Sequence, residues 1–378
     1  MVRKSKKEYL AKIRDRYRHA GRKHKNVILD EFCEVCDYHR KHAIRLLNQD
    51  GRRKRKKSGR PSKYGPEEIR VLEDIWLNAD RPCSSRLVGI IPLWLPFYEE
   101  QHGDLEAETR GKLLAAKART LDRVLGPTRK KHGSRGMSGT QHGDYLKSNI
   151  PIKINHGDVT EPGYIQADTV AHCGGSLEGN FVWSLTFTDI YSGWTENGAT
   201  WNKGEHGVHQ LLMCFEQGLP FAIRGFHSDN GGEFINHHLH SYYVKRKEPV
   251  AMTRGRVGQK NDNPHVEQKN FTHVRCLLGY QRIEDVSLVK TINELYEAAN
   301  LLNNFFCANR KIIFKERRGA RYYKKYDAPA TPSQRLLASD HITELQRTYL
   351  TEVQTNLNPY NLRKIIDSKR RHIFKKLR

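Results

Sequence analysis

Apolar positions near the start of the chain recur at the spacing of one helix face. Two groups of residues follow this spacing: Ile28, Leu29, Phe32, Val35 and Cys36, and then Ala43, Ile44 and Leu47. The break between the groups falls near Asp37–Tyr38. The pattern predicts two short helices joined by a tight turn within residues 1–50, as in a helix-turn-helix. A plain helical hairpin with a solvated basic face is the alternative.

A second helical block is predicted over residues 67–130. Residues 67–80 are amphipathic, residues 84–103 are apolar and interrupted by prolines, and residues 106–126 are rich in Ala and Leu. We expect the prolines to break the middle segment and the last segment to form one helix. Polar, glycine-rich residues then predict a linker over 131–154.

Strand patterns appear only after residue 155. Alternating β-branched and aromatic residues predict five strands, within 163–172, 181–193, 193–202, 221–234 and 249–256. Helical patterns occupy 204–218, 235–246 and 261–279. Three consecutive strands followed by alternating helices and strands predict an α/β unit over 155–300, with a mixed five-stranded sheet flanked by helices.

Charge is distributed unevenly along the chain, whose formal net charge is +24. The net charge is +15 over residues 1–63, +2 over 64–154, −5 over 155–300 and +12 over 301–378. Basic flanks attract a polyanion. An acidic centre beside an anionic partner favours a divalent cation, although an ordinary acidic domain between basic tails would have the same charges.

The basic residues suggest where DNA would bind. The second predicted helix of the first domain offers Tyr38, His39, Arg40, Lys41 and Arg45. The linker 51–66 has the composition of an arm that lies on phosphates or in a minor groove, and its basic residues are Arg52, Arg53, Lys54, Arg55, Lys56, Lys57 and Arg60. In a eukaryotic chain the same segment would read as a nuclear-localisation signal. Residues 67–130 are expected to form a second DNA-binding domain.

Three carboxylates stand where strands and a helix would bring them to one edge of the sheet. Asp168 lies within the first strand, Asp229 ends the fourth, and Glu267 follows the helix start at Asn263-Pro264. A carboxylate inside an apolar strand is costly unless it is paired or binds a metal. Taken singly, Asp229 is a turn residue and Glu267 an exposed helix residue. Asp189, Glu233 and Asp262 are rivals for a place in the set.

These residues resemble a known family. QADTVAH, HSDNGGEF and NDNPHVEQKNF are similar to the Asp-Asp-Glu core of retroviral-integrase-type transposases of bacterial insertion sequences, with 60 residues between Asp168 and Asp229 and 37 between Asp229 and Glu267. YDAPATPSQRLL, residues 326–337, also looks like the segment that follows that core. The resemblance covers about 155–300 and is weaker over the helical front.

The resemblance implies a ribonuclease-H-like catalytic core in which Asp168, Asp229 and Glu267 hold two Mg²⁺ (or Mn²⁺) ions. Its reaction would be DNA strand cleavage at element ends and strand transfer into target DNA. Four further residues would contact DNA or orient a ligand: Asn230, Lys260, Asn263 and Lys269. Pairing two DNA ends implies a homodimer or higher oligomer. The alternatives are a non-catalytic DNA-binding protein derived from a transposase, and a nuclease of the same fold that acts on RNA–DNA hybrids.

The remaining expectations concern zinc, the thiols and the C-terminal region. Zinc is not expected, because Cys33, Cys36, His39 and His42 are spaced so that one helix cannot close them into a tetrahedron. The seven scattered cysteines, the lack of an 18-residue apolar run and the polar N-terminus predict a cytoplasmic protein with reduced thiols. The resemblance implies that it is bacterial and nucleoid-associated. The basic region 301–378 is expected to contact DNA, as a small β-barrel or as a helical tail.

Overall fold

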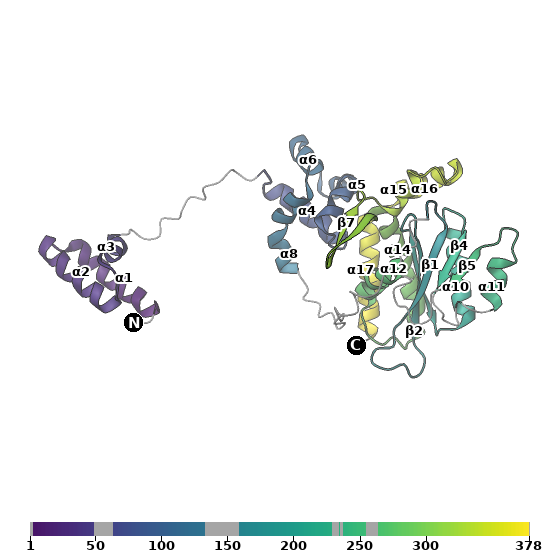
Figure 1. The fold of residues 1–378 in the computed structure, drawn as a ribbon, viewed down its shortest axis with the longest axis horizontal. Helices are drawn as coiled ribbons and strands as arrows, with labels where there is room; N and C mark the ends of the chain where they lie inside the picture. The colour runs from purple at the N-terminus through teal and green to yellow at the C-terminus, as the bar shows by residue number, and fades with distance from the viewer. Residues whose placement is uncertain are drawn as a thin grey trace. The chain divides into compact units, whose positions relative to one another are not determined.

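The computed structural model describes residues 3–48, 63–132, 159–228, 234, 237–254 and 264–377 (Figure 1). The chain divides into two compact units, Met1–Lys63 and Tyr64–Arg378. Most of the predicted linkers 51–66 and 131–154 lie outside the described residues. None of the described helices is long and apolar enough to cross a membrane.

The small unit is a bundle of three helices, α1 (Arg3–His19), α2 (Arg22–Cys36) and α3 (Arg40–Asn48). Its core is formed by Ile13, Tyr17, Ile28, Leu29, Phe32, Cys36, Ala43 and Leu47. Helix α2 ends at Asp37, which adopts the left-handed conformation with φ 54°. The predicted break therefore lies where the chain turns, while the helix-turn-helix assignment stays a prediction.

The large unit begins with a helical block: α4 (Pro66–Asn78), α5 (Ser84–His102), α6 (Ala107–Leu114), α7 (Ala118–Val124) and α8 (Gly126–His132). The expected single helix over 106–126 is two helices. The expected break at the prolines is also wrong, since α5 continues through Pro92 and Pro96. Both prolines are exposed and one turn apart, on the face opposite the buried Trp94. Packing of the buried face outweighs the lost backbone hydrogen bonds.

The mixed five-stranded sheet is confirmed. Its order is β3-β2-β1-β4-β5, with strands β1 (Tyr164–Ala171), β2 (Val182–Asp189), β3 (Thr195–Trp201), β4 (Gly225–Ser228) and β5 (Ala251–Arg254). Strands β1, β2 and β3 pair antiparallel, whereas β4 is parallel to both β1 and β5. The central strand β1 is therefore the one with an antiparallel neighbour on one side and a parallel neighbour on the other.

Helices flank the sheet as expected. They are α10 (Glu205–Gly218), α11 (His237–Val244), the continuous run α12 (Pro264–Lys269), η1 (Asn270–Arg275, a π-helix) and α13 (Cys276–Leu278), and the long α14 (Leu288–Phe306). The predicted boundary between residues 300 and 301 falls inside α14.

Three asparagines of α14 form a ladder along β3. Oδ1 of Asn293, Asn300 and Asn304 accepts hydrogen bonds from the backbone amides of Ala199, Asn197 and Thr195 at 2.6, 3.1 and 2.9 Å. Their amide groups donate back to the carbonyl oxygens of the same three residues. Each asparagine thus satisfies one donor and one acceptor of the strand.

The C-terminal region is a β-hairpin followed by helices. It is therefore neither a small β-barrel nor only a helical tail, the two forms that were expected. Its elements are β6 (Ile312–Arg318), β7 (Arg321–Tyr326), α15 (Pro332–Leu337), α16 (Glu344–Asn356) and α17 (Pro359–Lys376). Helix α17 packs along α14 and against α5. Tyr360 donates a hydrogen bond to Asp74 at 2.6 Å, and Trp94 Nε1 donates to the carbonyl oxygen of Phe306 at 3.0 Å.

One hydrophobic cluster therefore runs through the helical block, the sheet and the C-terminal helices. The predicted division of this unit into 67–130, 155–300 and 301–378 stays a prediction, and the three parts share this core.

Candidate active site

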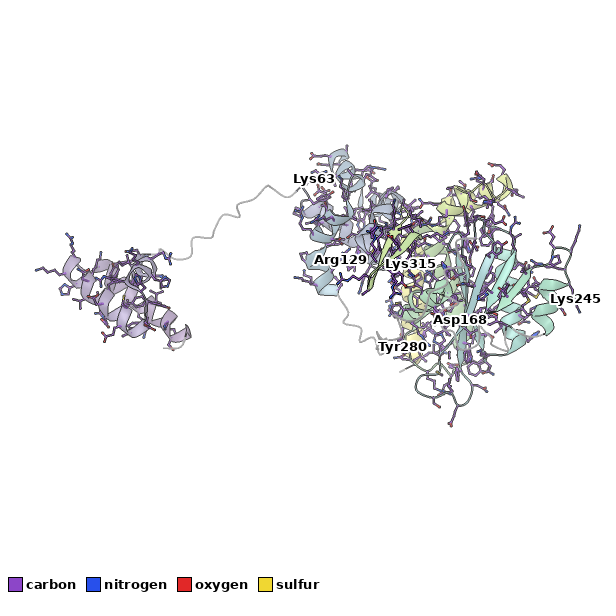
Figure 2. All side chains as sticks on the ribbon, in the orientation of Figure 1. Lys63, Arg129, Asp168, Lys245, Tyr280 and Lys315 are labelled. Atoms are coloured by element: carbon purple, nitrogen blue, oxygen red, sulfur yellow. The ribbon has the colours of Figure 1, made fainter. Side chains whose placement is uncertain are left out.

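Asp168 lies in the middle of the central strand (Figure 2). It pairs with Thr186 of β2, and its half-buried carboxylate accepts a hydrogen bond at Oδ1 from the backbone amide of Thr169 at 2.8 Å. On the other side of β1, Ala167 pairs with Ser228, the last residue of β4. The residue that follows Ser228 in the sequence is Asp229, which lies outside the described residues.

The start of α12 is tied to β1 by Gln166. Oε1 of this buried side chain accepts hydrogen bonds from the backbone amides of His265 and Val266 at 3.2 and 3.4 Å. These are amides of the first helical turn, which have no partner within the helix. Because residues 166 and 168 are two apart on a strand, they share one face of the sheet. The face that carries Asp168 is thus the face on which α12 begins.

Asn270 makes the second connection between the strand and this helix. Its Nδ2 donates a hydrogen bond to Oδ2 of Asp168 at 2.7 Å, and its Oδ1 is buried with no hydrogen-bond partner among the described residues. Asn270 begins the π-helical turn, an irregularity that occurs often at functional sites. It follows Glu267 by three residues, so both side chains lie on one side of the helix.

Glu267 is exposed on α12, between the two connections to β1. The structure therefore brings Asp168 together with the helix that carries Glu267. Of the other predicted site residues, Asp229, Asn230, Lys260 and Asn263 lie outside the described residues, as do the rivals Glu233 and Asp262.

Asp189, an alternative candidate for the set of three carboxylates, has a structural role. Its buried carboxylate accepts hydrogen bonds from the backbone amides of Gly163 and Ser192 at 2.9 and 2.7 Å and from the Ser192 hydroxyl at 2.6 Å. Burial raises the pKa of Asp189, and these donors oppose the rise. Asp189 thus closes the turn between β2 and β3.

His172 follows β1 directly and also belongs to the core. Its Nε2 lies 2.8 Å from Oγ of Ser184, which lies 2.7 Å from the Tyr296 hydroxyl. Burial, and then the nearby Arg275, lower the pKa of His172 to about 3. The imidazole is therefore neutral at physiological pH and joins β1 and β2 to α14.

Lys269 is half-buried beside η1. Its Nζ lies 3.4 Å from Nε2 of His273, and burial, with a smaller effect of Arg86, lowers its pKa to about 8. The proposed contact between Lys269 and a phosphate stays a prediction.

The predicted DNA-binding residues of the small unit lie around the turn between α2 and α3. His39, Arg40, Lys41 and Arg45 are exposed. Arg40 pairs with Asp30, and Nη2 of Arg45 lies 3.0 Å from Nδ1 of His42. Tyr38 is half-buried against Phe32, with ring centroids 5.8 Å apart. The seven predicted basic residues from Arg52 to Arg60 lie outside the described residues.

Donor chemistry at the candidate site suits a hard divalent cation, since Asp168 and Glu267 offer only carboxylate oxygens. The described residues include no group of three His, Cys, Asp or Glu side chains placed to hold a metal ion. One member of the predicted set, Asp229, is outside them. In the small unit, Cys36 is fully buried in the core and Cys33 packs against it.

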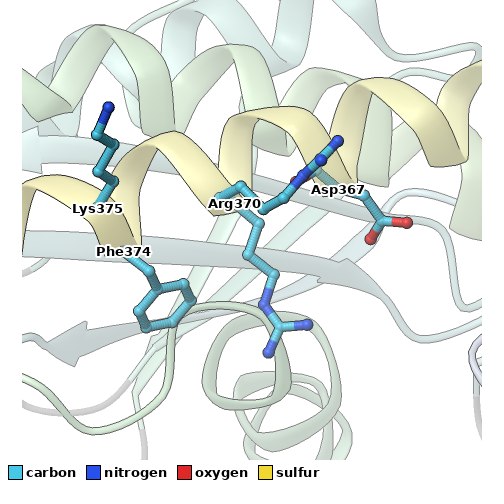
Figure 3. A pocket seen from close by; sticks show the side chains of 5 residues that line it. Asp367, Arg370, Phe374 and Lys375 are labelled. Carbon is cyan, nitrogen blue, oxygen red and sulfur yellow. The ribbon is translucent and has the colours of Figure 1, made fainter.

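A separate hollow of about 650 Å³ lies along α17 (Figure 3). Its lining residues are Asp367, Arg370, Arg371, Phe374 and Lys375. The Arg370 guanidinium lies over the Phe374 ring, 5.5 Å from its centroid. None of these residues belongs to the predicted site.

Comparison with known proteins places the chain beside one bacterial relative. It is 37% identical over 331 residues to the uncharacterized protein y4rM of Sinorhizobium fredii (strain NBRC 101917 / NGR234), a match that covers 86% of this chain and 93% of that protein. The chain belongs to the y4rM family. No family model matches the chain.

Solved structures with some likeness are retroviral integrases. The catalytic core domain of BIV integrase is 18% identical with a TM-score of 0.31, and the match covers 47% of this chain and 96% of that one. A chain of the simian T-cell lymphotropic virus intasome in complex with PP2A regulatory subunit B56 gamma is 14% identical with a TM-score of 0.26, covering 31% and 40%. TM-scores of this size are too low to assign a fold or an activity.

Proposed function

We propose that this member of the y4rM family is a DNA transposase that carries out metal-dependent strand cleavage at the ends of an insertion sequence and strand transfer into target DNA. The observation that carries the proposal is the connection of Asp168, on the central strand, to the helix of Glu267 through Asn270.

The register of β1 and β4 supports the inclusion of Asp229. Ala167 of β1 and Ser228 of β4 are partners in the parallel pairing. Asp168 and Asp229 are the residues that directly follow these two in the sequence. Parallel strands end at the same edge of a sheet, where α/β proteins place their sites. Because Gln166 and Asn270 connect β1 to the helix that carries Glu267, we propose that the three carboxylates form one site.

The carboxylates of Asp168, Asp229 and Glu267 would hold two Mg²⁺ or Mn²⁺ ions, which when bound stabilise the attacking and leaving oxygens of an in-line displacement at phosphorus. The remaining contributions come from the chain. Asn270 orients the Asp168 carboxylate through Oδ2. Gln166 fixes the first turn of α12 and with it the position of Glu267. Side chains held in this way need little reorganisation when a substrate binds.

The proposed partner is double-stranded DNA. The chain carries net charges of +15 over residues 1–63 and +12 over 301–378, which precede and follow the sheet in the sequence. Phosphate contacts from such flanks position a duplex without reading its sequence. Because transposition joins two element ends to one target, the active form is proposed to be a homodimer or a higher oligomer on DNA.

The decisive experiment compares the full-length wild type with Asp168→Asn. Nicking of supercoiled plasmid, and of duplexes taken from both flanks of the gene, is measured with Mg²⁺, Mn²⁺ or EDTA. We expect Asp168→Asn to lower metal-dependent nicking by at least about 100-fold, because a metal ligand is lost. Its affinity for DNA in EDTA and its melting temperature should stay close to those of the wild type.

Asp104→Asn is the matched control, since it removes one exposed carboxylate from outside the candidate site. It should nick at the wild-type rate. Equal nicking by wild type and Asp168→Asn contradicts the proposal. DNA binding by the wild type without any metal-dependent nicking would instead identify a non-catalytic DNA-binding protein derived from a transposase.

A further inference from the structure

The β6–β7 hairpin exposes both of its faces. Every residue of β6 and β7 is exposed except Lys315, which is half-buried. Six large hydrophobic side chains of the hairpin are at least 40% exposed: Ile312, Ile313, Phe314, Tyr322, Tyr323 and Tyr326. A two-stranded hairpin with neither face packed is only marginally stable by itself. Exposed aromatic residues on such an element therefore point to a binding partner.

The hairpin is held firmly at its base. The backbones of Asn309 and Ala330 form a bridge just before β6 and after β7. Asp327 accepts a hydrogen bond from the Lys311 amide at 2.7 Å and pairs with Arg335 of α15, whose Nε also donates to Oδ1 of Asn309 at 3.0 Å. Gly319, with φ 62°, allows the tight two-residue loop at the tip. The two strands are thus a fixed arm.

Both faces of the arm carry three basic side chains, and they differ in that only one of them also carries an acidic residue. Lys315 pairs directly with Lys324, and Arg317 with Tyr322, so these four side chains share one face, called here the cationic face. The Lys315 ammonium lies over the Tyr322 ring, 4.4 Å from its centroid. The opposite face carries Arg318, Arg321 and Lys325 together with Glu316, whose carboxylate forms an ion pair with Arg318.

Like charges directly opposite each other destabilise a strand pair. Burial, and then the charge of Lys324, lower the pKa of Lys315. The cationic face has three basic side chains and no carboxylate of its own, and residues 312–326 together hold six Lys/Arg against one Glu. An anionic partner would offset this repulsion.

We propose that the cationic face of the β6–β7 hairpin binds the phosphodiester backbone of duplex DNA. A two-stranded ribbon fits the major groove, and Lys, Arg and Tyr are common donors to phosphate oxygens. The position of the four residues on a fixed arm orders them before DNA arrives, which reduces the entropy lost on binding. This inference rests on the proposed function for its partner, double-stranded DNA, and assigns the contact to four residues that require neither the carboxylates nor a metal ion.

A site-specific crosslink tests the contact in the full chain. p-Azidophenylalanine is placed at Tyr322 or, as the control, at Tyr349, an exposed tyrosine on α16. Each protein is irradiated with a labelled duplex in EDTA. We expect the yield of DNA crosslink to be at least about fivefold higher from position 322, since crosslinking needs direct proximity. Equal yields from the two positions, or no crosslink at 322, would overturn the proposal.

The salt dependence of binding gives a second measurement. The double variant Lys315→Gln/Lys324→Gln is compared with Lys245→Gln/Lys247→Gln, which removes the same charge from two exposed lysines after α11. For the hairpin variant, the slope of log K against log salt should fall by about 2, at roughly 0.9 per lost phosphate contact. The control should keep the wild-type slope. A hairpin variant with the wild-type slope, or an equal fall in the control, contradicts the inference.

The two measurements also separate this inference from the proposed function. Both are made in EDTA, where no metal-dependent nicking occurs. If the protein crosslinks through position 322 but never nicks DNA, the proposed hairpin site is supported and the proposed transposase function is contradicted. If it nicks DNA without a crosslink at position 322, the transposase function is supported and the hairpin site is contradicted.

Discussion

Nδ2 of Asn270 lies 2.7 Å from Oδ2 of Asp168, and this hydrogen bond joins two residues that are 102 positions apart in the chain. It fixes the orientation of a half-buried carboxylate from the helix that also carries Glu267. Since groups that orient a metal ligand commonly change metal affinity or activity by 10–100-fold when mutated, the bond makes a direct prediction.

Asn270→Leu removes the donor while it nearly preserves the size of the side chain. We expect metal-dependent nicking to fall by about 10-fold or more, and half-saturation to require more Mg²⁺. The cost in unfolding free energy should be about 1 kcal/mol. Single-turnover nicking against Mg²⁺ concentration measures the effect. Asn356→Leu, at an exposed asparagine of α16, is the control, and an unchanged Mg²⁺ dependence in Asn270→Leu would mean that the bond is only structural.

Gln166→Leu leaves the His265 and Val266 amides without the acceptor that they have in the folded protein. Because Gln166 is buried, we expect a loss of about 1–3 kcal/mol in the free energy of unfolding, measured by urea denaturation. Gln268→Ala, at an exposed position of the same helix, should lose less than about 0.5 kcal/mol. Similar losses in the two variants would contradict the role assigned to Gln166.

The titration of Glu196 should make the free energy of unfolding depend on pH. Burial raises its pKa from the ordinary value of 4.5 to about 7, although Trp194 and Asn300 donate hydrogen bonds to its carboxylate. Below pH 4.5 the group is protonated in the folded and unfolded states. Between pH 4.5 and 7 only the unfolded chain releases the proton, so stability falls as pH rises.

The measurement compares wild type with Glu196→Gln from pH 4 to pH 8. Relative to this variant, the wild type should lose stability by up to about 3 kcal/mol between pH 4.5 and 7, and the difference should stay constant above pH 7. A difference that does not change with pH would show that Glu196 titrates at its ordinary value.

Asn304→Leu interrupts the asparagine ladder at the end nearest the β2–β3 turn. Asn304 is buried, and its loss leaves the amide and carbonyl groups of Thr195 without these partners. We expect a destabilisation of about 2–4 kcal/mol, measured by thermal or urea unfolding. Asn303→Leu, at the half-buried neighbouring position, should cost much less. Equal costs would show that packing, rather than the hydrogen bonds, explains the effect.

Much of the sheet could be predicted because its strands have strong local patterns. Alternation of apolar and polar residues located all five strands, and Asn263-Pro264 located the start of α12. Helix α14 was not predicted, although LVKTINELYEAANLLNNFF is amphipathic, since its buried face includes the polar residues Asn300 and Asn304. Helix α5 is continuous where a break was predicted, because packing of its buried face outweighs the local effect of Pro92 and Pro96.

The candidate site was predicted only as far as its acids. Asp168 and Glu267 were predicted from their positions within a strand and after a helix start, whereas Gln166 and Asn270 were not predicted. Polar side chains that hold a site in place carry no motif of their own. Asn270 had one local signal, its place one turn after Glu267, but its partner is 102 residues away and only the fold brings them together.

The asparagine ladder also restricts how copies of this protein assemble. Strand β3 is an outermost strand of the sheet, and the backbone groups of Thr195, Asn197 and Ala199 are already bonded to α14. A strand from another molecule would find those donors and acceptors occupied. Two protomers therefore cannot join into one continuous sheet through these backbone groups of β3.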